Sequence, residues 1–288
     1  MRLRPDLDVT ALVSVGAVLL VMAVLLNWLT LKVLRPARAP IDRTPRSMGI
    51  SAEDVEFLSD GRTLRGWFLD GDADNTRPVV LLAHGWGANA GTVLPLGVAF
   101  GETGLDVMVF DFRHHGRSDD APRVTMLEYA ADFDAAVVYA RARFPGRRIV
   151  LAGHSMGGAA SILAVAGGTP ADGLLVVAAP ADFFDVTASY LGPGPLGLLM
   201  LTLTAPFFLF HVRRWWTSLV PDRHIGEISV PISIVHGDRD RRVPLSHMHR
   251  LAGEAGVEPL VLEDTGHIDI LHNAVLHAHA LEFVSSLS

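Results

Sequence analysis

The pentapeptide Gly153-His154-Ser155-Met156-Gly157 has the residue types and spacing of a serine nucleophile site. An apolar run, 148–152, precedes it, and a stretch of small residues with helical potential, 158–164, follows it. A strand, a sharp turn and a helix in this order form the G-x-S-x-G arrangement, in which the turn strains the serine backbone and exposes its oxygen. Glycines two positions on either side avoid collisions with the neighbouring strand and helix. We therefore predict that Ser155 is a nucleophile.

A nucleophilic serine needs a base, and the base needs an acid that orients it. The β-branched run 232–236 indicates a buried strand, and it leads into a loop that contains Asp238 and Asp240. The next apolar strand, 259–262, leads into a loop that contains His267. Catalytic groups of open α/β sheets gather at the carboxyl ends of strands. The chain therefore offers an acid and a base after the serine, in the order that this turn requires.

Together these motifs resemble those of the α/β-hydrolase superfamily, specifically its serine hydrolases, from about residue 53 to the C-terminus. In that family the acid usually stands just before a two-residue gap and Val-Pro, which Asp240-Arg241-Arg242-Val243-Pro244 matches. The resemblance implies that Asp240 is the triad acid and His267 the general base. Asp238 stays open as the alternative acid, its other interpretation being a turn residue that bonds its own backbone.

The resemblance also implies an oxyanion hole. The apolar strand 79–83 ends in His84-Gly85-Trp86-Gly87. In the resembling enzymes, the residue after this His-Gly and the residue after the nucleophile each donate a backbone N–H, and here these are Trp86 and Met156. Each such donor lowers the barrier by roughly 3 kcal/mol. We expect His84 to bond within the loop rather than to act as a base.

A further loop, after the strand 107–109, resembles the D-x-R-x-x-G-x-S loop of the family, in which we expect Asp111 and Arg113 to pair. Adjacent histidines in this loop and others near the C-terminus raise the question of a metal. Adjacent side chains point in different directions, however, and no further ligand stands at a plausible spacing. We therefore expect no metal and no cofactor. The histidines concerned are His114, His115, His272, His277 and His279.

The N-terminal stretch 9–31 carries no charge. At about 1.5 Å per residue, its roughly 23 residues are long enough to cross a bilayer. A secretory signal peptide is the alternative, but its apolar region is only about 7–15 residues long. Ala37-Arg38-Ala39 superficially fits a cleavage site, whereas Pro40 and the long span argue against cleavage. We predict an uncleaved transmembrane anchor in 1–34 and an extended linker over 35–49. Since the catalytic motifs begin at His84, we expect a chain without the anchor to retain its activity on short esters.

Charges indicate the orientation and exclude some partners. Arg2 and Arg4 precede the span, and a larger basic group follows it, which favours a cytoplasmic catalytic domain with the N-terminus outside. The net charge of −7 argues against nucleic-acid binding, so we expect the basic group to meet anionic lipid headgroups. The chain has no cysteine, which excludes a disulfide scaffold without identifying the compartment. The basic group consists of Lys32, Arg35, Arg38, Arg43 and Arg46.

A second apolar concentration, 190–212, lies where α/β-hydrolases insert a cap over the active site. Glycines and prolines interrupt it, so we expect one or two short helices rather than a second spanning helix, within a cap insertion of about 181–228. Tryptophan beside arginine suits a membrane–water boundary, and a cap helix buried on the core is the alternative. In either arrangement, apolar side chains cover Ser155. The aromatic and basic residues concerned are Arg213, Arg214, Trp215 and Trp216.

Strands that alternate with helices predict the α/β class and the α/β-hydrolase fold. We expect a mostly parallel eight-stranded sheet with helices on both faces, an antiparallel hairpin over 55–69 at its edge, and a catalytic domain over 50–288. The expected function is a membrane-anchored serine hydrolase that cleaves carboxylic esters of hydrophobic acyl groups through an acyl-enzyme. The same residues would serve a thioesterase or a serine peptidase, and a non-catalytic membrane scaffold is a second class. The expected partners are the acyl ester and the lipid bilayer, and the oligomeric state stays open.

Overall fold

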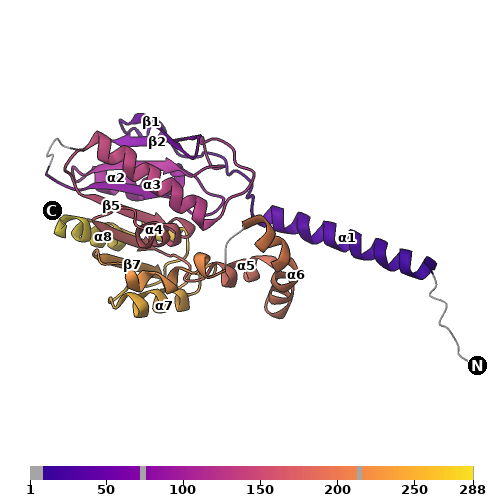
Figure 1. Cartoon of the computed structure of the whole chain (residues 1–288). Helices are drawn as coiled ribbons and strands as arrows, with labels where there is room; N and C mark the ends of the chain where they lie inside the picture. The colour runs from indigo at the N-terminus through magenta and orange to yellow at the C-terminus, as the bar shows by residue number, and fades with distance from the viewer. Residues whose placement is uncertain (1–8, 72–75, 213–215, 288) are drawn as a thin grey trace, which may run out of the picture.

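The computed structural model describes residues 9–71, 76–212 and 216–287. Its centre is one eight-stranded sheet with the strand order β1-β2-β4-β3-β5-β6-β7-β8 (Figure 1). The number of strands and the α/β-hydrolase fold predicted from the sequence are confirmed. The strands are β1 Glu53–Ser59, β2 Arg62–Leu69, β3 Val79–Ala83, β4 Asp106–Asp111, β5 Ile149–His154, β6 Gly173–Val177, β7 Ile232–Gly237 and β8 Leu260–Leu262.

The sheet is antiparallel at one edge and parallel elsewhere. Strands β1 and β2 form the predicted hairpin, and β2 pairs antiparallel with β4. Its two turn residues, Asp60 and Gly61, have φ values of 48° and 73°, the positive pair that a type I′ hairpin turn requires. All later pairings, from β4 with β3 to β7 with β8, are parallel. The carboxyl ends of six neighbouring parallel strands therefore meet along one edge of the sheet.

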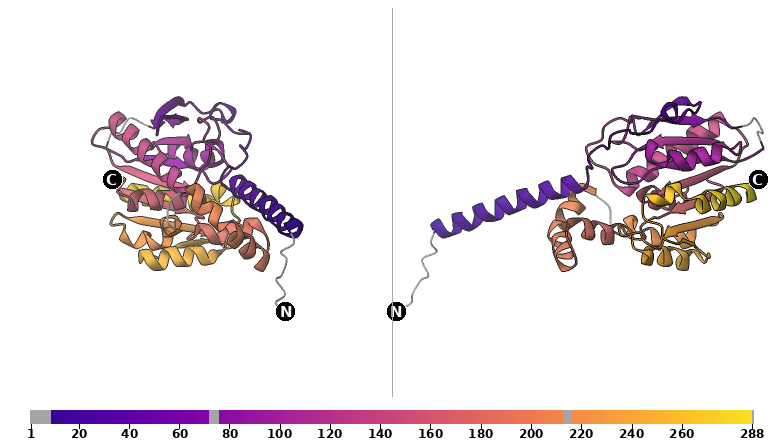
Figure 2. Two further views of the ribbon diagram at one scale, coloured as in Figure 1. Left: turned by 45° about the vertical axis from the view of Figure 1, so that its right-hand side comes forward. Right: turned by 180° about the vertical axis from the view of Figure 1, so that it is seen from behind.

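Helices cover both faces of the sheet, as Figure 2 shows from two further sides. Side chains of β3 alternate between two hydrophobic clusters: Val79 and Leu81 pack with α3, α4 and α7, whereas Val80 and Leu82 pack with α2 and α8. Strands buried on both faces explain the continuous apolar runs in the sequence. The helices are α1 Val9–Val33, α2 Ala90–Gly101, α3 Met126–Arg143, α4 Met156–Ala166, α5 Phe183–Leu191, α6 Pro195–Val212, α7 Leu245–Ala255 and α8 Ala274–Ser286.

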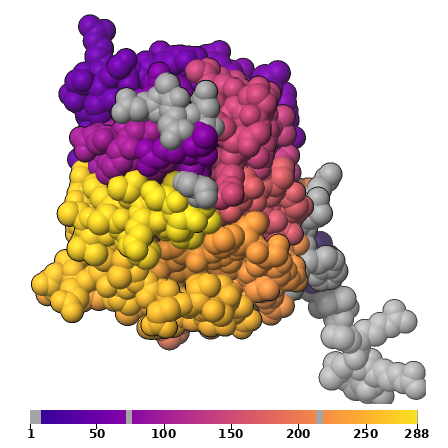
Figure 3. All heavy atoms as spheres, turned by 90° about the vertical axis from the view of Figure 1, so that its left-hand side faces the viewer, coloured from indigo at the N-terminus to yellow at the C-terminus, as the bar shows by residue number. Residues whose placement is uncertain are grey.

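Helix α1 projects from the α/β domain (Figure 1). It is long and apolar enough to cross a membrane, a test that a signal sequence also passes, and most of its large side chains are exposed. It continues two residues beyond the predicted end, and Thr30, Val33 and Leu34 are buried. Figure 3 shows the opposite end of the domain, where α8 (yellow) lies between the early part of the chain and α7 (orange). Helices α1 and α8 thus lie at opposite ends of the domain.

The segment after α1 runs along the surface of the domain. Residues 36–44 form neither helix nor strand, and a short 3-10 turn follows at Arg46–Met48. The Nη1 group of Arg38 donates to the carbonyl of Gly116 at 2.9 Å, and the side-chain amide of Asn89 donates to the carbonyl of Pro40 at 2.9 Å. These contacts attach the segment to the loops that follow β3 and β4.

The segment in which we expected a cap contains α5 and α6, and the expectation of short helices is wrong for α6, which has 18 residues. The glycines and prolines gather at 192–197, in the turn and the first helical turn, where Pro195 is favourable. Only Pro206 lies in the helix interior, and the helix continues through it. Arg213, Arg214, Trp215 and the side chain of Trp216, on which we based the membrane-boundary interpretation, lie outside the described residues.

Candidate active site

Ser155 occupies a strained turn between β5 and α4. Its φ of 56° and ψ of −123° lie in a region that non-glycine residues rarely adopt. A Cβ atom at Gly153 would lie 2.4 Å from the carbonyl carbon of Gly157, and one at Gly157 would lie 2.5 Å from the carbonyl oxygen of His84. Only glycine fits at either position. The local sequence therefore forms the sharp strand-turn-helix connection that exposes the serine oxygen.

The structure brings Ser155, His267 and Asp240 together from three separate loops. The Nε2 atom of His267 lies 2.9 Å from Oγ of Ser155, and its Nδ1 atom lies 2.6 Å from Oδ2 of Asp240. With Nδ1–H donating to the carboxylate, Nε2 is free to accept the proton of the serine hydroxyl. This is the arrangement in which an imidazole acts as a general base for a serine.

The carboxylate of Asp240 is held in its charged form. Burial raises the pKa of Asp240, but the hydrogen bonds from His236 and His267 and the backbone N–H of Val243 outweigh it and hold this pKa well below its usual range. Its Oδ1 atom accepts the N–H groups of Arg242 and Val243, each at 2.9 Å. These bonds explain the family's spacing between the acid and Val-Pro, because the residues of the gap fold back onto the carboxylate.

The alternative acid, Asp238, lies elsewhere. Its side chain is exposed, and Oδ1 accepts the N–H of Thr265 at 3.2 Å. It thus caps the neighbouring loop rather than its own turn. The residue that contacts the imidazole of His267 is Asp240.

Trp86 and Met156 flank the serine. Both line the pocket that contains Ser155, and Met156 is the first residue of α4, where backbone N–H groups point out of the helix. The chain just before Trp86 touches the serine, since a Cβ atom at Gly85 would lie 2.8 Å from Cβ of Ser155. The two residues expected to donate N–H groups to an oxyanion therefore lie on the two segments that border Ser155.

Two buried histidines hold the segment that contains Trp86. In His84, Nδ1–H donates to the carbonyl of Gly85 at 2.7 Å and Nε2 accepts the N–H of Phe112 at 3.2 Å. Burial lowers the pKa of His84 to about 4 and that of His115 to about 3. The Nε2 atom of His115 accepts the N–H of Gly87 at 3.1 Å. Both rings are neutral and bond within the loops, as we expected of His84.

The expected ion pair between Asp111 and Arg113 is wrong. The guanidinium of Arg113 instead pairs with Asp132 on α3, with Nη2 2.6 Å from Oδ1. The carboxylate of Asp111 turns to the backbone and accepts the N–H groups of Ala90 at 2.7 Å and Arg117 at 2.9 Å. Asp111 thereby ties β4 to the start of α2, and Arg113 ties the loop to α3.

Four of the five histidines that raised the question of a metal have structural partners. His114 pairs with Asp120, and the Nδ1–H of His115 donates to the carbonyl of Arg113 at 2.9 Å. No three His, Cys, Asp or Glu side chains gather as a metal set in 9–71, 76–212 or 216–287. Near the C-terminus, His277 bonds the carbonyl of Leu271 at 2.9 Å, and His279 lies 2.8 Å from the hydroxyl of Ser233.

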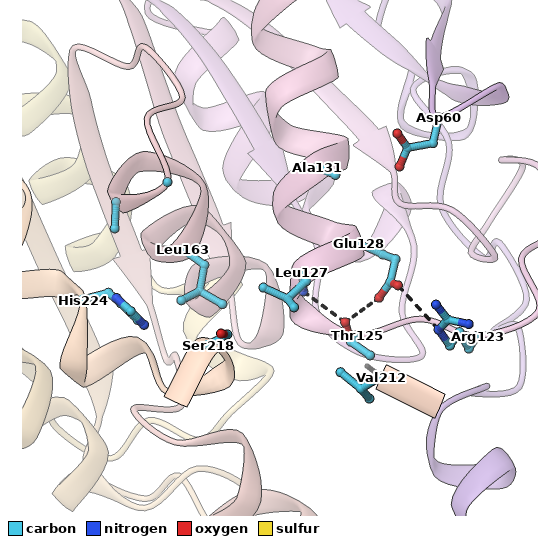
Figure 4. A pocket seen from close by; sticks show the side chains of 12 residues that line it. Asp60, Arg123, Thr125, Leu127, Glu128, Ala131, Leu163, Val212, Ser218 and His224 are labelled. Atoms are coloured by element: carbon cyan, nitrogen blue, oxygen red, sulfur yellow. Dashed lines mark hydrogen bonds and ion pairs between the residues drawn. The ribbon is translucent and has the colours of Figure 1, made fainter. Parts of the chain in front are cut away.

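The pocket at Ser155 is apolar. Its walls come from the end of α1, the loops after β3, β5 and β6, helix α5 and the loop after β7, and none of the described lining residues is charged. A larger cavity lies between the start of α3 and the end of α6, with Arg123, Thr125 and Glu128 among its lining residues (Figure 4). That cavity contains no residue of the triad. The lining residues of the apolar pocket are Val33, Trp86, Ser155, Met156, Pro180, Phe183, Val186, Thr187, Tyr190 and Val243.

Sequence reasoning missed three residues of this site. His236 lies one residue before the end of β7, and its Nε2 atom is 3.3 Å from Oδ2 of Asp240. Tyr190 lies at the rim of the pocket, and Val33 comes from the predicted anchor. The four-residue spacing of His236 and Asp240 is a signal that was available, whereas nothing in the sequence connects Val33 with Ser155.

Known proteins resemble this chain in sequence and in fold. The model of the family described as "Serine aminopeptidase, S33" matches residues 74–215. YfhR of Escherichia coli is 30% identical over 249 residues, which cover 82% of this chain and 81% of that protein. A monoacylglycerol lipase of Mycolicibacterium smegmatis is 27% identical over 233 residues, which cover 68% of this chain and 81% of the lipase. The esterase Pf2001 of Pyrococcus furiosus has the same fold, with a TM-score of 0.67 at 21% identity over 88% of this chain and 96% of the esterase.

Proposed function

The chain belongs to the α/β-hydrolase superfamily, and we propose that it is a membrane-anchored serine hydrolase that cleaves carboxylic esters of hydrophobic acyl groups. One observation carries the proposal: the imidazole of His267 bonds Oγ of Ser155 at 2.9 Å and Oδ2 of Asp240 at 2.6 Å. A non-catalytic scaffold would need neither the strained turn at Ser155 nor the two hydrogen bonds of His267.

In the proposed mechanism, His267 takes the hydroxyl proton as the oxygen of Ser155 attacks the ester carbonyl. The backbone N–H groups of Trp86 and Met156 receive the charge that develops on the carbonyl oxygen. Asp240 keeps the proton of His267 on Nδ1 and stabilises the imidazolium. His267 then protonates the leaving alcohol. Water activated by the same imidazole releases the acid from the acyl-enzyme and restores Ser155.

The pocket supports an apolar acyl group rather than a peptide. An aminopeptidase must bind a charged α-amino group, and a buried charge needs a partner of opposite sign. The described walls of the pocket at Ser155 offer aromatic and aliphatic side chains and no carboxylate. A thioester places the same acyl group at the same atoms, so a thioesterase remains the alternative on this triad.

Membrane attachment is part of the proposal. Most of the large apolar side chains of α1 are exposed, and immersion in a bilayer would remove this surface from water. The basic residues that follow α1 favour a cytoplasmic position of the catalytic domain, because cations concentrate on that side. The N-terminus would then lie on the outer side.

Labelling with a fluorophosphonate probe tests the proposal. Membranes that contain the protein should show a labelled band of its size, and Ser155→Ala should abolish both this band and ester hydrolysis. Ser161→Ala is the matched control, because Ser161 is buried in α4 and donates only to the carbonyl of Gly158. Equal labelling of Ser155→Ala would rule out the nucleophile. A panel that compares esters and thioesters of one acyl group then separates the two remaining activities.

A further inference from the structure

The last turn of α1 is built into the α/β domain. Val33 is 6% exposed and Leu34 is fully buried. The N–H of Leu34 donates to the carbonyl of Thr30 at 2.9 Å, and the carbonyl of Leu34 accepts the N–H of Val124 at 2.8 Å. Val33 and Leu34 belong to the same hydrophobic cluster as Met156. The end of α1 is therefore part of the domain core rather than a flexible tether.

Val33 also forms a wall of the pocket that contains Ser155. Side chains of α5, among them Phe183 and Val186, form other parts of the wall. A segment that the sequence assigns to membrane attachment alone thus contributes a side chain to the space next to the nucleophile.

A second hollow, which we call the outer groove, adjoins this pocket at Tyr190. Tyr190 lines both hollows and is 76% exposed. In α1, the ammonium of Lys32 lies 5.0 Å from the ring centroid of Trp28, and such pairs are typical of the membrane–water boundary. The outer groove therefore extends from the part of α1 that carries Trp28 and Lys32 to the pocket of Ser155. Its lining residues are Trp28, Leu31, Lys32, Arg35, Pro36, Ala37, Arg38, His114, Asp120 and Tyr190.

Helix α6 lies beside the same end of α1, at an angle to it (Figures 1 and 2). A hydrogen bond joins the two helices, because Nε2–H of His211 donates to Oδ1 of Asn27 at 2.8 Å. Helix α6 thus presents an apolar surface next to the domain end of a candidate membrane span. Such a surface can be buried where the headgroups of a bilayer meet its acyl chains. The exposed large side chains of α6 are Leu196, Leu198, Leu199, Leu203, Leu209 and Phe210.

We propose that the last turn of α1 determines substrate specificity, and that the outer groove admits the acyl chain of a membrane lipid ester from the bilayer. Val33 limits the width of the acyl pocket, and the chain passes over Tyr190 to reach Ser155. The acyl chain contacts the apolar walls of the inner pocket, and the lipid headgroup contacts the charged lining of the outer groove, which includes Lys32, Arg35 and Arg38. This inference rests on the ester hydrolysis proposed above.

Substitutions at Val33 test the specificity. The full-length protein is assayed in detergent on p-nitrophenyl esters from acetate to palmitate. Val33→Trp should lower turnover of the long esters at least about tenfold relative to acetate, and labelling by a small fluorophosphonate checks that the variant keeps a reactive Ser155. The matched control is Val21→Trp, which places the same side chain on an exposed part of α1 and should leave every ester unaffected.

Val33→Ala supplies the opposite change and guards against misfolding of the larger variant. It should shift the preference towards longer or bulkier acyl groups. If both variants changed all chain lengths by one factor, Val33 would be structural only and the inference would be overturned. A wild-type chain that hydrolyses no ester would instead refute the proposed function itself.

A charge at the rim tests the route from the bilayer. Tyr190→Arg should lower hydrolysis of a long-chain ester embedded in liposomes at least about tenfold more than hydrolysis of soluble acetate, because a charged side chain opposes the passage of an acyl chain. Leu58→Arg is the control, since Leu58 is 70% exposed on β1 at the edge of the sheet. Equal effects of Tyr190→Arg on both substrates would contradict entry over this residue.

Discussion

The Nε2 atom of His236 lies 3.3 Å from Oδ2 of Asp240, the carboxylate oxygen that also bonds Nδ1 of His267 at 2.6 Å. The buried ring of His236 donates from Nε2–H to the carbonyl of Val243 at 2.8 Å. The N–H of Val243 in turn donates to Oδ1 of Asp240 at 2.9 Å. His236 therefore fixes the loop of the acid and lies against the acid itself.

This arrangement predicts that His236 is a positioning residue. His236→Leu should lower kcat by roughly 10- to 100-fold with little change in KM, because a hydrogen bond within a charged network contributes about 1.5–3 kcal/mol. His236→Gln, which can still donate to Val243, should recover part of the rate. Steady-state kinetics on a soluble ester make the comparison. A raised KM at constant kcat would mean that His236 acts on substrate binding instead.

The two acids of the loop should behave differently. Asp240→Asn should lower kcat/KM about 10⁴-fold, because the amide leaves the imidazole in the wrong tautomer. Asp238→Asn is the matched control and should leave kcat/KM within a few-fold, because Asp238 is exposed and its Oδ1 caps the N–H of Thr265. A larger loss in Asp238→Asn would reverse the assignment.

The buried histidines predict that stability falls with acid. In the folded chain, burial lowers the pKa of His84 to about 4 and that of His115 to about 3. In the unfolded chain both take up protons near pH 6.5. Between that pH and about 4, only the unfolded chain binds these protons, so the free energy of unfolding falls as the pH falls. Each histidine contributes about 1.4 kcal/mol per pH unit within this window.

Urea unfolding of the detergent-solubilised protein at several pH values measures this slope. His115→Gln removes one of the titrating groups and should make the slope shallower by about one proton. Ser246→Gln, on an exposed position of α7, removes no titrating group and should leave the slope unchanged. Equal slopes in wild type and His115→Gln would show that the ring is not excluded from protonation in the folded chain.

Two truncations separate membrane attachment from the site. A chain that begins at Leu29 keeps Val33 and Leu34, and it should retain the thermal stability of the domain and the hydrolysis of acetate esters. A chain that begins at Arg35 loses both buried side chains, which costs about 2–5 kcal/mol for a leucine alone, and should melt several degrees lower. This adds a loss of stability to our expectation that a chain without residues 1–34 retains its activity on short esters. Equal melting temperatures would contradict a structural role of the last turn.

The sheet and the triad were accessible from the sequence because their signals are local. Apolar runs bounded by loops mark the eight strands, and Ser155, Asp240 and His267 each stand in a short motif at the end of a strand. The positions of the glycines around Ser155 depend on contacts within the same turn, so the pentapeptide alone predicts them.

The errors concern contacts between distant segments. Asp132, the partner of Arg113, lies 19 residues further along the chain, in a helix whose periodicity says nothing about pairing. The proximity of Val33 to Ser155 depends on how α1 enters the domain. Helix α6 continues through Pro206, which local propensity disfavours, while its apolar side chains pack on α5 and α1. Tertiary packing, rather than local sequence, decides each of these features.

Trapping of the acyl-enzyme tests the central claim most directly. The purified protein is mixed with a p-nitrophenyl ester, the burst of p-nitrophenol is recorded, and the quenched protein is mapped by mass spectrometry. We predict a burst of about one equivalent per active site and an acyl adduct on Ser155. Hydrolysis without a burst and without an adduct, or an adduct on another residue that persists in Ser155→Ala, would contradict the account.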